Sequence, residues 1–375
     1  MPLERKQIKD ILADLDKKMV IVVGPRQVGK TWIAREVMRY FSRTQYLNWD
    51  NPEDRAIIRA GVFPQTLELL VLDEIHKMRN WKSFVKGIYD TKPSGMRMLI
   101  TGSARLGALK KVGDAMTGRY FEHRILPLSL AELKGTPYEG GIDRLLSRGG
   151  FPEPFLSDSE SDAARWRNQY VENNVRMEVL DFATLHDIAA MADIVKILRT
   201  KVGSPISYKN IADDVGISSI TVKRYIQILE DLHLVFSLRT YTKKITRAIK
   251  KEPKIYFYDI ALVEGPAARL ENLVALSLVK DTAYRRDAKG EDIAIAYVRT
   301  KEDREVDFAI VKDGTLVELI EVKTSDTQPA PQLRYFMARN GAQATQVVKD
   351  MRHSELISGG VRIVRMKEYL EGLMM

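Results

Sequence analysis

Short apolar runs alternate with helical stretches through the first part of the chain. The candidate strands lie at Met19–Val23, Gln45–Asn48, Leu69–Leu72 and Met98–Thr101, and the longest apolar runs among them, such as Met19–Val23 and Leu69–Leu72, have the length of a buried strand. Strands that alternate with helices are typical of a parallel sheet, because parallel neighbours need a crossover connection. We therefore expect an α/β fold for residues 1–140, with a parallel sheet at its centre.

Two turn-rich segments interrupt this pattern. KGTPYEGG at Lys134–Gly141 and SRGGFPEPF at Ser147–Phe155 concentrate glycine and proline, which favour a domain boundary. Residues 161–200 then read as helices. We expect residues 141–200 to form a helical lid or linker.

A helix-turn-helix pattern occupies residues 205–240. Tyr208–Val215 predicts a first helix, Gly216 a turn and Ser218–Leu232 a second helix. Helical spacing collects one apolar face on the second helix, made of Val222, Tyr225, Ile226 and Leu229. The opposite face carries Lys223 and Arg224, which we expect to contact DNA phosphates. We interpret residues 201–245 as a winged helix-turn-helix.

The composition is that of a globular protein with a basic surface. The chain has 375 residues, 45% of them hydrophobic and 29% charged, and it has no cysteine, which excludes disulfides and thiolate metal sites. The net charge of +9 permits an acidic partner such as DNA, although an ordinary basic protein has the same excess. No apolar run approaches the roughly 20 residues of a membrane helix. We therefore expect a cytoplasmic protein with no membrane partner.

Residues 24–31 read GPRQVGKT, the pattern of a phosphate-binding P-loop. The octet follows an apolar strand and precedes a helical stretch at Trp32–Tyr40, which is the context that a P-loop requires. We expect Lys30 to reach the β- and γ-phosphates of ATP and the Thr31 hydroxyl to bind Mg²⁺. The expected nucleotide-binding residues are Gly24, Pro25, Arg26, Gln27, Val28, Gly29, Lys30 and Thr31.

A pair of acids follows the third apolar run. Asp73 and Glu74 come directly after Leu69–Leu72. Behind a P-loop, this placement predicts that Asp73 holds Mg²⁺ and that Glu74 polarises the attacking water.

Hydroxyl groups follow the fourth run, and an arginine lies further along. Thr101 and Ser103 are expected beside Glu74, where they would orient the water or sense the γ-phosphate; an ordinary turn is the alternative. Arg119 is a candidate for stabilising the transferred phosphate across a subunit interface. A surface arginine in a salt bridge is the alternative for Arg119.

Six short segments occur in a fixed order along the chain: GPRQVGKT at 24–31, DEIHK at 73–77, TGSARL at 101–106, TGRY at 117–120, LPLSLAEL at 126–133 and GGFPEP at 149–154. With these segments, the chain resembles the prokaryotic AAA-type ATPases that carry a C-terminal domain of unknown function. The resemblance covers nearly the whole chain. It implies an AAA-type ATPase core, a winged-helix middle and a restriction-endonuclease-like C-terminal fold over residues 250–375. Similar proteins usually carry glutamine in place of His76, so we expect an exposed or capping histidine there.

The C-terminal part contains a candidate hairpin with nuclease-like chemistry. Residues 305–323 read EVDFAIVKDGTLVELIEVK, and two alternating runs flank Asp313–Gly314. Asp307 lies on the first run, and Glu321 and Lys323 share one face of the second. The order D…E-x-K is that of restriction-endonuclease-like nucleases, in which Asp307 and Glu321 would bind Mg²⁺ and Lys323 would help to activate water. An exposed strand face with alternating charges is the alternative.

The hairpin register tests this interpretation. A two-residue loop would pair Asp307 with Ile320 and send Glu321 to the opposite face, whereas a three-residue loop would pair Asp307 with Glu321. We therefore expect an odd-length loop. Glu271, in the helical run ENLVALSLV, is a candidate for a further acid; a solvated glutamate at a helix start is the alternative.

Three functions are compatible with these features. The first is a DNA-acting ATPase motor, expected as a homo-oligomer in a hexameric ring, that works on branched DNA such as a Holliday junction, with or without metal-dependent cleavage. The second is a regulatory or defence-type ATPase switch whose C-terminal domain binds a protein. The third is a transcription regulator that uses ATP as a switch.

Overall fold

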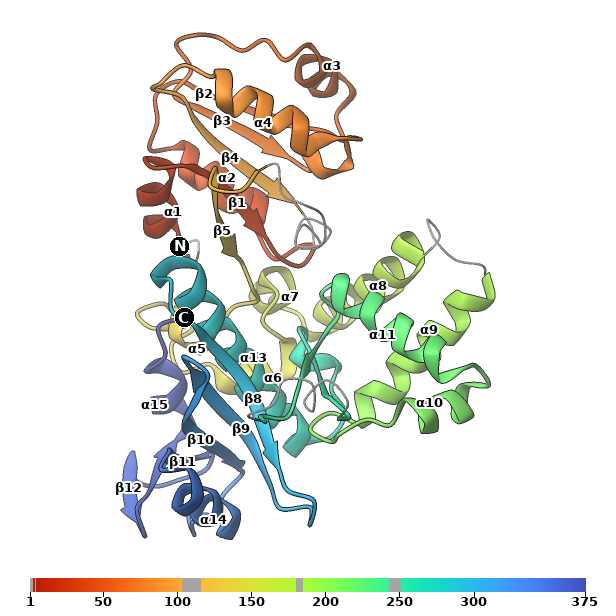
Figure 1. Ribbon diagram of the computed structural model, residues 1–375, viewed down its shortest axis with the longest axis vertical. Coiled ribbons are helices and arrows are strands. Elements are labelled where there is room, and N and C mark those ends of the chain that lie inside the picture. Colours follow the sequence, from red (N-terminus) through yellow and green to blue (C-terminus); the bar gives the residue numbers. More distant parts are fainter. Residues whose placement is uncertain (1–2, 4, 103–115, 180–184, 243–250) are drawn as a thin grey trace. The chain divides into compact units, whose positions relative to one another are not determined.

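The computed structural model describes residues 3, 5–102, 116–179, 185–242 and 251–375 (Figure 1). The chain divides into two compact units. The first comprises Met1–Leu126 with Asp231–His233, and the second comprises Pro127–Glu230 with Leu234–Met375. Among the residues described, no helix is both long enough and apolar enough to cross a membrane.

The first unit is built on a five-stranded sheet in which all neighbours are parallel, in the order β2-β3-β4-β1-β5. Its strands are β1 (Met19–Val23), β2 (Thr44–Asn48), β3 (Leu69–Asp73), β4 (Arg97–Gly102) and β5 (Tyr120–Arg124). The first four confirm the predicted strands. The fifth was not predicted, because its sequence YFEHR lacks an apolar run and only His123 is buried.

Helices cover this sheet. They are α1 (Ile8–Leu15), α2 (Lys30–Met38), α3 (Pro52–Ala60), α4 (Trp81–Thr91) and the 3₁₀ turn η1 (Ile75–Lys77). Alternate residues of β1 pack in one core with Ile58 of α3 and Val85 of α4. Helices α1 and α2 lie against β1, β3 and β4. Because the central strands β1, β3 and β4 are buried on both faces, they read as nearly continuous apolar runs.

The second unit begins with helices and a two-stranded antiparallel ribbon. Its elements are α5 (Leu130–Leu133), α6 (Ile142–Arg148), α7 (Pro152–Leu156), α8 (Glu160–Val179), α9 (Leu185–Thr200), α10 (Tyr208–Val215), α11 (Ser219–Asp231), β6 (Val235–Leu238), β7 (Lys254–Phe257) and η3 (Ile260–Leu262). Helices α10 and α11 confirm the predicted pair. The four apolar residues predicted on one face of α11 are buried, and Lys223 and Arg224 are exposed.

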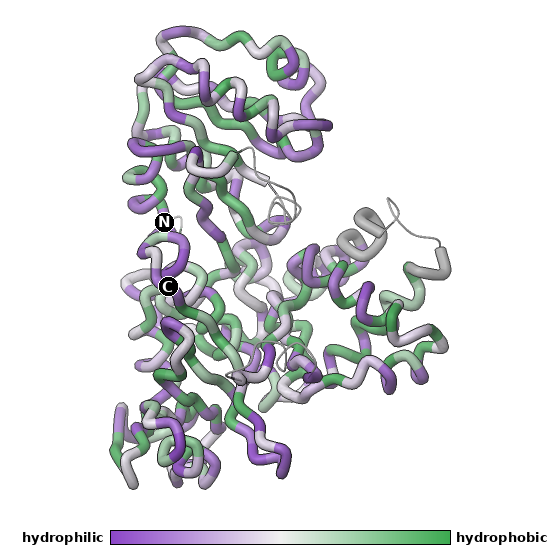
Figure 2. The backbone as a smooth tube through the Cα atoms, in the orientation of Figure 1, coloured by the Kyte–Doolittle hydropathy of each residue, from purple (hydrophilic) through white to green (hydrophobic). Residues whose placement is uncertain are grey.

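The second unit ends in a six-stranded mixed sheet of order β12-β13-β11-β10-β9-β8. Its elements are α13 (Pro266–Lys289), β8 (Ile293–Arg299), β9 (Glu305–Lys312), β10 (Thr315–Lys323), α14 (Pro331–Asn340), β11 (Gln343–Val348), β12 (Glu355–Ser358), β13 (Val361–Arg365) and α15 (Met366–Glu371). Strands β8, β9 and β10 are antiparallel neighbours, and β10 pairs with β11 in parallel. The connection between β8 and β9, residues 300–304, is hydrophilic (Figure 2).

Candidate functional site

The P-loop connects the end of β1 to the start of α2. A Cβ atom at Gly24 would lie 2.0 Å from the Ile125 carbonyl oxygen, so only glycine fits beside β5 at this position. Gly29 caps α2 with φ 98°, a left-handed conformation that glycine adopts without strain. These two glycines therefore shape the loop that presents its backbone N–H groups at the helix N-terminus.

Lys30 is buried beneath this loop. Its side chain reaches back, and Nζ donates hydrogen bonds to the carbonyl oxygens of Gly24 at 2.9 Å and Pro25 at 2.6 Å. Burial lowers the pKa of Lys30 to about 8, although the negative charges of Glu74 and Asp73 oppose this shift. The ammonium group lies at the position where phosphate oxygens would give it stronger partners than carbonyls.

Asp73 lies at the end of β3 and accepts three side-chain hydrogen bonds. Thr31 Oγ1 donates to Oδ2 at 2.9 Å, and the Tyr46 hydroxyl donates to the same oxygen at 2.5 Å. The Thr101 hydroxyl, from neighbouring β4, donates to Oδ1. The prediction that β4 places Thr101 next to the acids is confirmed by the register, in which Asp73 pairs with Thr101. Ser103 lies outside the described residues.

This arrangement suits the Mg²⁺ ion that accompanies ATP. The Thr31 hydroxyl and the Asp73 carboxylate are the oxygen ligands that Mg²⁺ uses with nucleotide phosphates, and they already lie within hydrogen-bond distance of each other. Tyr46 is a contact that the sequence did not reveal. Its hydroxyl stays protonated, since burial and the hydrogen bond to Asp73 raise its pKa.

Glu74 follows directly and has a left-handed backbone, with φ 55°. Its N–H donates to the Thr101 carbonyl oxygen at 3.1 Å. Its Oε2 lies 3.5 Å from Lys77 Nζ and 3.7 Å from His76 Nε2. Burial raises the pKa of Glu74, while Lys77 and Lys30 oppose the shift. The carboxylate therefore has the raised basicity of a general base and is partly restrained by an ion pair.

His76 corrects an expectation. We expected an exposed or capping histidine, but the side chain is only 5% exposed and lies against Glu74. The short turn η1 places residue 76 beside residue 74, which a reading of the linear sequence does not capture.

Arg119 lies at the opposite end of the strands from the P-loop. It immediately precedes β5, whose first residue pairs with Met19, whereas the P-loop follows the last residue of β1, Val23. Its Nε lies 2.7 Å from Asp90 Oδ1 of α4, so within this chain Arg119 forms the salt bridge that we considered as an alternative. Its role across a subunit interface stays a prediction.

The β9–β10 hairpin places Glu321 opposite Asp307, as expected, but with a different loop and register than expected. Thr315 pairs with Lys312, so the loop is the two-residue Asp313–Gly314 and the prediction of an odd-length loop is wrong. Both loop residues have positive φ, 50° and 73°, as a tight hairpin turn requires. The register then shifts at Val317, where a β-bulge supplies one extra residue.

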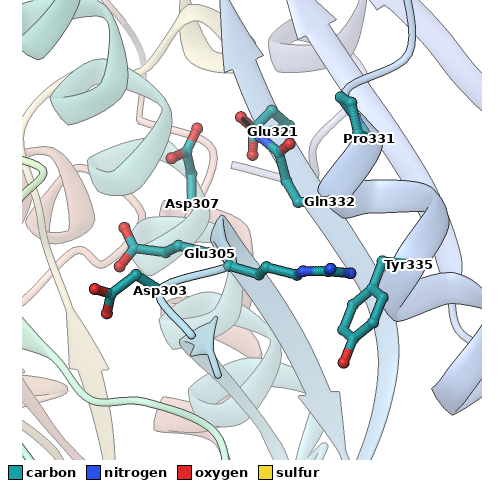
Figure 3. Close-up of a pocket in the computed structure, with 8 residues that line it drawn as sticks. Asp303, Glu305, Asp307, Glu321, Pro331, Gln332 and Tyr335 are labelled. Atoms are coloured by element: carbon teal, nitrogen blue, oxygen red, sulfur yellow. Dashed lines mark hydrogen bonds between the residues drawn. The ribbon is translucent and has the colours of Figure 1, made fainter. Parts of the chain in front are cut away.

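Beyond the bulge, Ile320 pairs with Phe308, and the next position brings Glu321 opposite Asp307. Lys323 Nζ donates to Glu321 Oε1 at 2.7 Å, and Asp307 Oδ2 accepts from the Val322 N–H at 2.9 Å. Gln332 of α14 also donates to Glu321 Oε1, at 2.8 Å. Figure 3 shows Asp307 and Glu321 on neighbouring strands with Gln332 beside Glu321. The three predicted residues are therefore together.

Two hollows meet at these carboxylates. The larger, of about 570 Å³, also involves Glu305, Gln332 and Tyr335 (Figure 3). The smaller, of about 280 Å³, lies beside Glu271 and Lys323. Asp307 and Glu321 line both. The candidate site is therefore open to a ligand on either side.

A buried lysine completes the group, and sequence analysis missed it. In the sequence, Lys254 ends the basic stretch KKITRAIKKEPK at 243–254, but it is the first residue of β7 and its side chain is 1% exposed. Its Nζ lies 2.8 Å from Glu305 Oε1, 3.4 Å from Glu271 Oε1 and 3.9 Å from Asp307 Oδ1. The only sequence signal for Glu305 was its spacing of two from Asp307, which places both on one strand face.

Burial and neighbouring charges both shift the pKa values of Asp307 and Lys254. Burial raises the pKa of Asp307 well above its usual value, and Glu271 and Glu321 raise it further, while Lys254 opposes the shift. For Lys254, burial lowers the pKa, but the surrounding carboxylates outweigh it and the net shift is upward. Lys254 is thus held as a cation by the acids that surround it.

Asp307 and Glu321 are the residues expected to bind a second metal ion. Among the residues that the structure describes, no group of three or more His, Cys, Asp or Glu side chains has a metal-binding arrangement. Lys254 Nζ instead lies among the acids. As arranged, this centre does not fit a divalent cation.

Comparisons with known proteins agree with the first site. Residues 16–134 match the model of an AAA domain. Residues 16–134 are an AAA-type P-loop ATPase domain. Residues 140–271 and 267–369 match two domains of unknown function, DUF8612 and DUF4143.

Two uncharacterized proteins are similar in sequence to this chain over much of their length. The uncharacterized protein Rv2008c of Mycobacterium tuberculosis is 24% identical over 309 residues, which are 79% of this chain and 68% of that protein. An uncharacterized protein of Haemophilus influenzae is 22% identical, covering 69% of this chain and 74% of its own.

Two solved structures also match. A Walker-type ATPase of Pyrococcus abyssi has a TM-score of 0.45 and 12% identity, over 69% of this chain and 94% of that one. A RuvB variant of Thermotoga maritima has a TM-score of 0.32 and 16% identity, over 62% and 89% respectively.

Proposed function

We propose that this chain hydrolyses ATP to remodel DNA. The observation that carries the ATPase part is the contact of the Thr31 hydroxyl with Asp73, at 2.9 Å, next to the buried Lys30 ammonium. Bound Mg²⁺ would supply charge neutralisation to the phosphates during transfer.

The residues of the site have separate roles in this proposal. Lys30 exchanges the carbonyls of Gly24 and Pro25 for phosphate oxygens when ATP binds. Glu74 takes the proton of the attacking water, once its contact with Lys77 loosens. Arg119 of a neighbouring subunit stabilises the transferred phosphate in a homo-oligomeric, hexameric ring.

The DNA part of the proposal is supported by the second unit. Lys223 and Arg224 are exposed on α11, and the β6–β7 ribbon follows that helix, as in a winged helix-turn-helix. In such folds, the second helix approaches the major groove and its basic residues pair with phosphates. We propose branched DNA, such as a Holliday junction, as the substrate.

We propose that the C-terminal domain has a restriction-endonuclease-like fold that holds DNA. Its support is the position of Glu321 opposite Asp307, one residue beyond the Ile320–Phe308 pair, and the contact of Lys323 with Glu321, at 2.7 Å. Cleavage would require a metal ion at these carboxylates. Because Lys254 lies there instead, we assign this domain to DNA binding.

The test measures binding and cleavage with duplex, single-stranded, forked and four-way DNA, each with ATP and Mg²⁺. The proposal expects salt-dependent binding, strongest for four-way DNA, ATP-dependent remodelling that Lys30→Ala removes, and no cleavage. Absence of binding to every DNA form would refute the DNA part. Cleavage that Asp307→Ala and Lys323→Ala abolish would show instead that the domain is an active nuclease.

A second candidate is a regulatory ATPase switch that binds a protein. It is favoured by Ile220, which is 81% exposed at the start of α11. Burial of this apolar side chain against a protein partner would remove it from water, which favours binding. Under this alternative, Ile220→Ser weakens binding to the partner, and the chain shows no salt-dependent affinity for DNA. Under the DNA proposal, Lys223→Ala with Arg224→Ala is the more damaging change.

A further inference from the structure

We propose that the Lys254 ammonium is a built-in cation that takes the place of a divalent metal ion in the C-terminal carboxylate centre. The native centre then holds its acids together without metal. This inference deepens the proposed role of the C-terminal domain in holding rather than cutting DNA, but its geometry does not depend on DNA being the ligand.

The ammonium lies among acids that come from two different elements. Glu271 belongs to α13, whereas Glu305 and Asp307 belong to β9. Lys254 Nζ contacts these three at 3.4, 2.8 and 3.9 Å respectively. Glu305 and Glu271 lie within hydrogen-bond distance of the ammonium N–H donors, and Asp307 lies within ion-pair distance.

The backbone fixes the position of Lys254. It pairs with Leu238 in the β6–β7 ribbon and forms a bridge with Pro205. Its ammonium also lies 5.5 Å from the centre of the Tyr297 ring, within the range of a cation–π contact. A lysine held in this way from several sides does not swing out to admit another cation.

Glu271 is equally constrained. The Tyr256 hydroxyl donates to its Oε1 at 2.7 Å. A Cβ atom at Gly203 would lie 2.5 Å from its Oε2, so the backbone of that loop lies close to the carboxylate and leaves no room for a side chain between them. The acid therefore stays turned toward Lys254 rather than toward solvent.

The repulsion between the carboxylates of this centre has to be offset by a cation. Glu271, Glu305, Asp307 and Glu321 line or adjoin the same hollows, and buried carboxylates so close together repel one another. Lys323 contacts only Glu321 among the described residues, at 2.7 Å. Lys254 is therefore the group that offsets the charge of the other three.

Lys254 and a metal ion exclude each other. Mg²⁺ holds carboxylate oxygens at about 2.0–2.1 Å, whereas the Lys254 ammonium keeps them 2.8 to 3.9 Å from its nitrogen. A metal ion at this point would also lie against a positive charge. Replacement of the ammonium by an uncharged side chain of similar length should convert the centre into a cation site.

The test is a calorimetric titration of the full chain with MnCl₂, without nucleotide. The wild-type protein should show no Mn²⁺ binding that depends on Asp307, as judged against Asp307→Asn. Lys254→Met should bind Mn²⁺ at least about tenfold more tightly than the wild type. Adding Asp307→Asn to Lys254→Met should abolish the gained site.

Lys312→Met is the matched control, because it removes a lysine from the same sheet. Lys312 pairs with Glu291 and its side chain is 43% exposed, so its loss should not create a Mn²⁺ site. A lysine that only stabilises the fold would lower the unfolding temperature when removed, but it would not produce a cation site that Asp307→Asn removes.

Two results would overturn the inference: Asp307-dependent Mn²⁺ binding by the wild type, or no gain of binding in folded Lys254→Met. If Lys254→Met does not fold without metal, the wild-type titration still decides, and Mn²⁺ should restore folding of the variant. No readout here uses ATP turnover or DNA. A failure to bind DNA would therefore refute the proposed function and leave this inference standing.

Discussion

Thr31 and Asp73 are joined by a hydrogen bond of 2.9 Å between the first turn of α2 and the end of β3. The two residues expected to hold Mg²⁺ are thus assembled before nucleotide arrives. Since the ligands are already in place, ATP binding should require little rearrangement of β3.

Lys30→Ala should weaken ATP binding by about 10- to 150-fold, because hydrogen bonds to a charged group are lost from the phosphates. A fluorescent-nucleotide titration measures this. Lys17→Ala, at a lysine whose side chain is 62% exposed in the same unit, is the control and should bind normally. Unchanged affinity in Lys30→Ala would refute the P-loop assignment.

ATP affinity should fall as the pH rises through about 8. The free site has a Lys30 pKa of about 8, lowered by burial, so the ammonium is charged below that pH and becomes neutral above it. Only the charged form attracts phosphate, and bound phosphate raises the pKa, so the affinity is highest below pH 8. Titrations from pH 6.5 to 9.5 should show this decline in the wild type and a flat profile in Lys30→Ala.

Glu74→Gln should keep ATP binding and slow turnover by about 10² to 10⁴-fold, because the amide accepts no proton from water. Steady-state phosphate release and a binding titration on the same preparation separate the two effects. Glu68→Gln, at an acid that pairs with Arg43, serves as the control. Normal turnover in Glu74→Gln would assign the proton transfer to another residue.

Arg119→Ala should reduce hydrolysis by roughly 10³-fold or more if the arginine acts on a neighbouring subunit. Asp90→Ala is the matched variant, since it breaks the same salt bridge and leaves the arginine in place. Asp90→Ala should therefore retain turnover. Equal turnover in both variants, with equally small losses of stability, would show that Arg119 is only a salt-bridge partner. Mixtures of Arg119→Ala and Lys30→Ala chains should recover part of the activity at mixed interfaces.

Changing both Lys223 and Arg224 to alanine should weaken DNA binding. The slope of log affinity against log salt should fall by about one to two units, since two phosphate contacts are lost. The charge-matched control replaces Lys196 and Lys201, two exposed lysines outside α11, and should leave the slope unchanged. Equal effects in both double variants would indicate net charge rather than contact by α11.

The sequence predicted the features that short-range patterns encode. Strands β1 to β4 follow from the runs of mainly apolar residues, and the P-loop follows from its spacing of glycines, lysine and threonine. Strand β5 was missed because an edge strand needs fewer apolar residues. Tyr46 was missed because its contact with Asp73 arises only when β2 and β3 pair.

Lys254 shows a stronger limit of sequence reasoning. Several basic residues precede it within a dozen positions along the chain, and such a stretch predicts a solvated surface. Its burial depends on Glu271 and Glu305, which reach it only through the tertiary fold. The sequence correctly predicted that Asp307 and Glu321 share one face of the hairpin, but it wrongly predicted a three-residue loop. The bulge was missed because it leaves no clear trace in the alternation of VEL at 317–319.

The bulge at Val317 decides whether Glu321 lies on the same face of the hairpin as Asp307. Thirteen residues separate Asp307 from Glu321. The paired residues between them contribute an even number, so Asp307 and Glu321 face each other only if the unpaired residues of the turn and any bulge add up to an odd number. A two-residue turn with one bulge satisfies this condition, and so does a three-residue turn with none. Single insertions or deletions in this stretch therefore carry Glu321 to the opposite face, whereas paired ones restore it. Among divergent relatives, turn length and strand regularity should consequently change together, each compensating for the other.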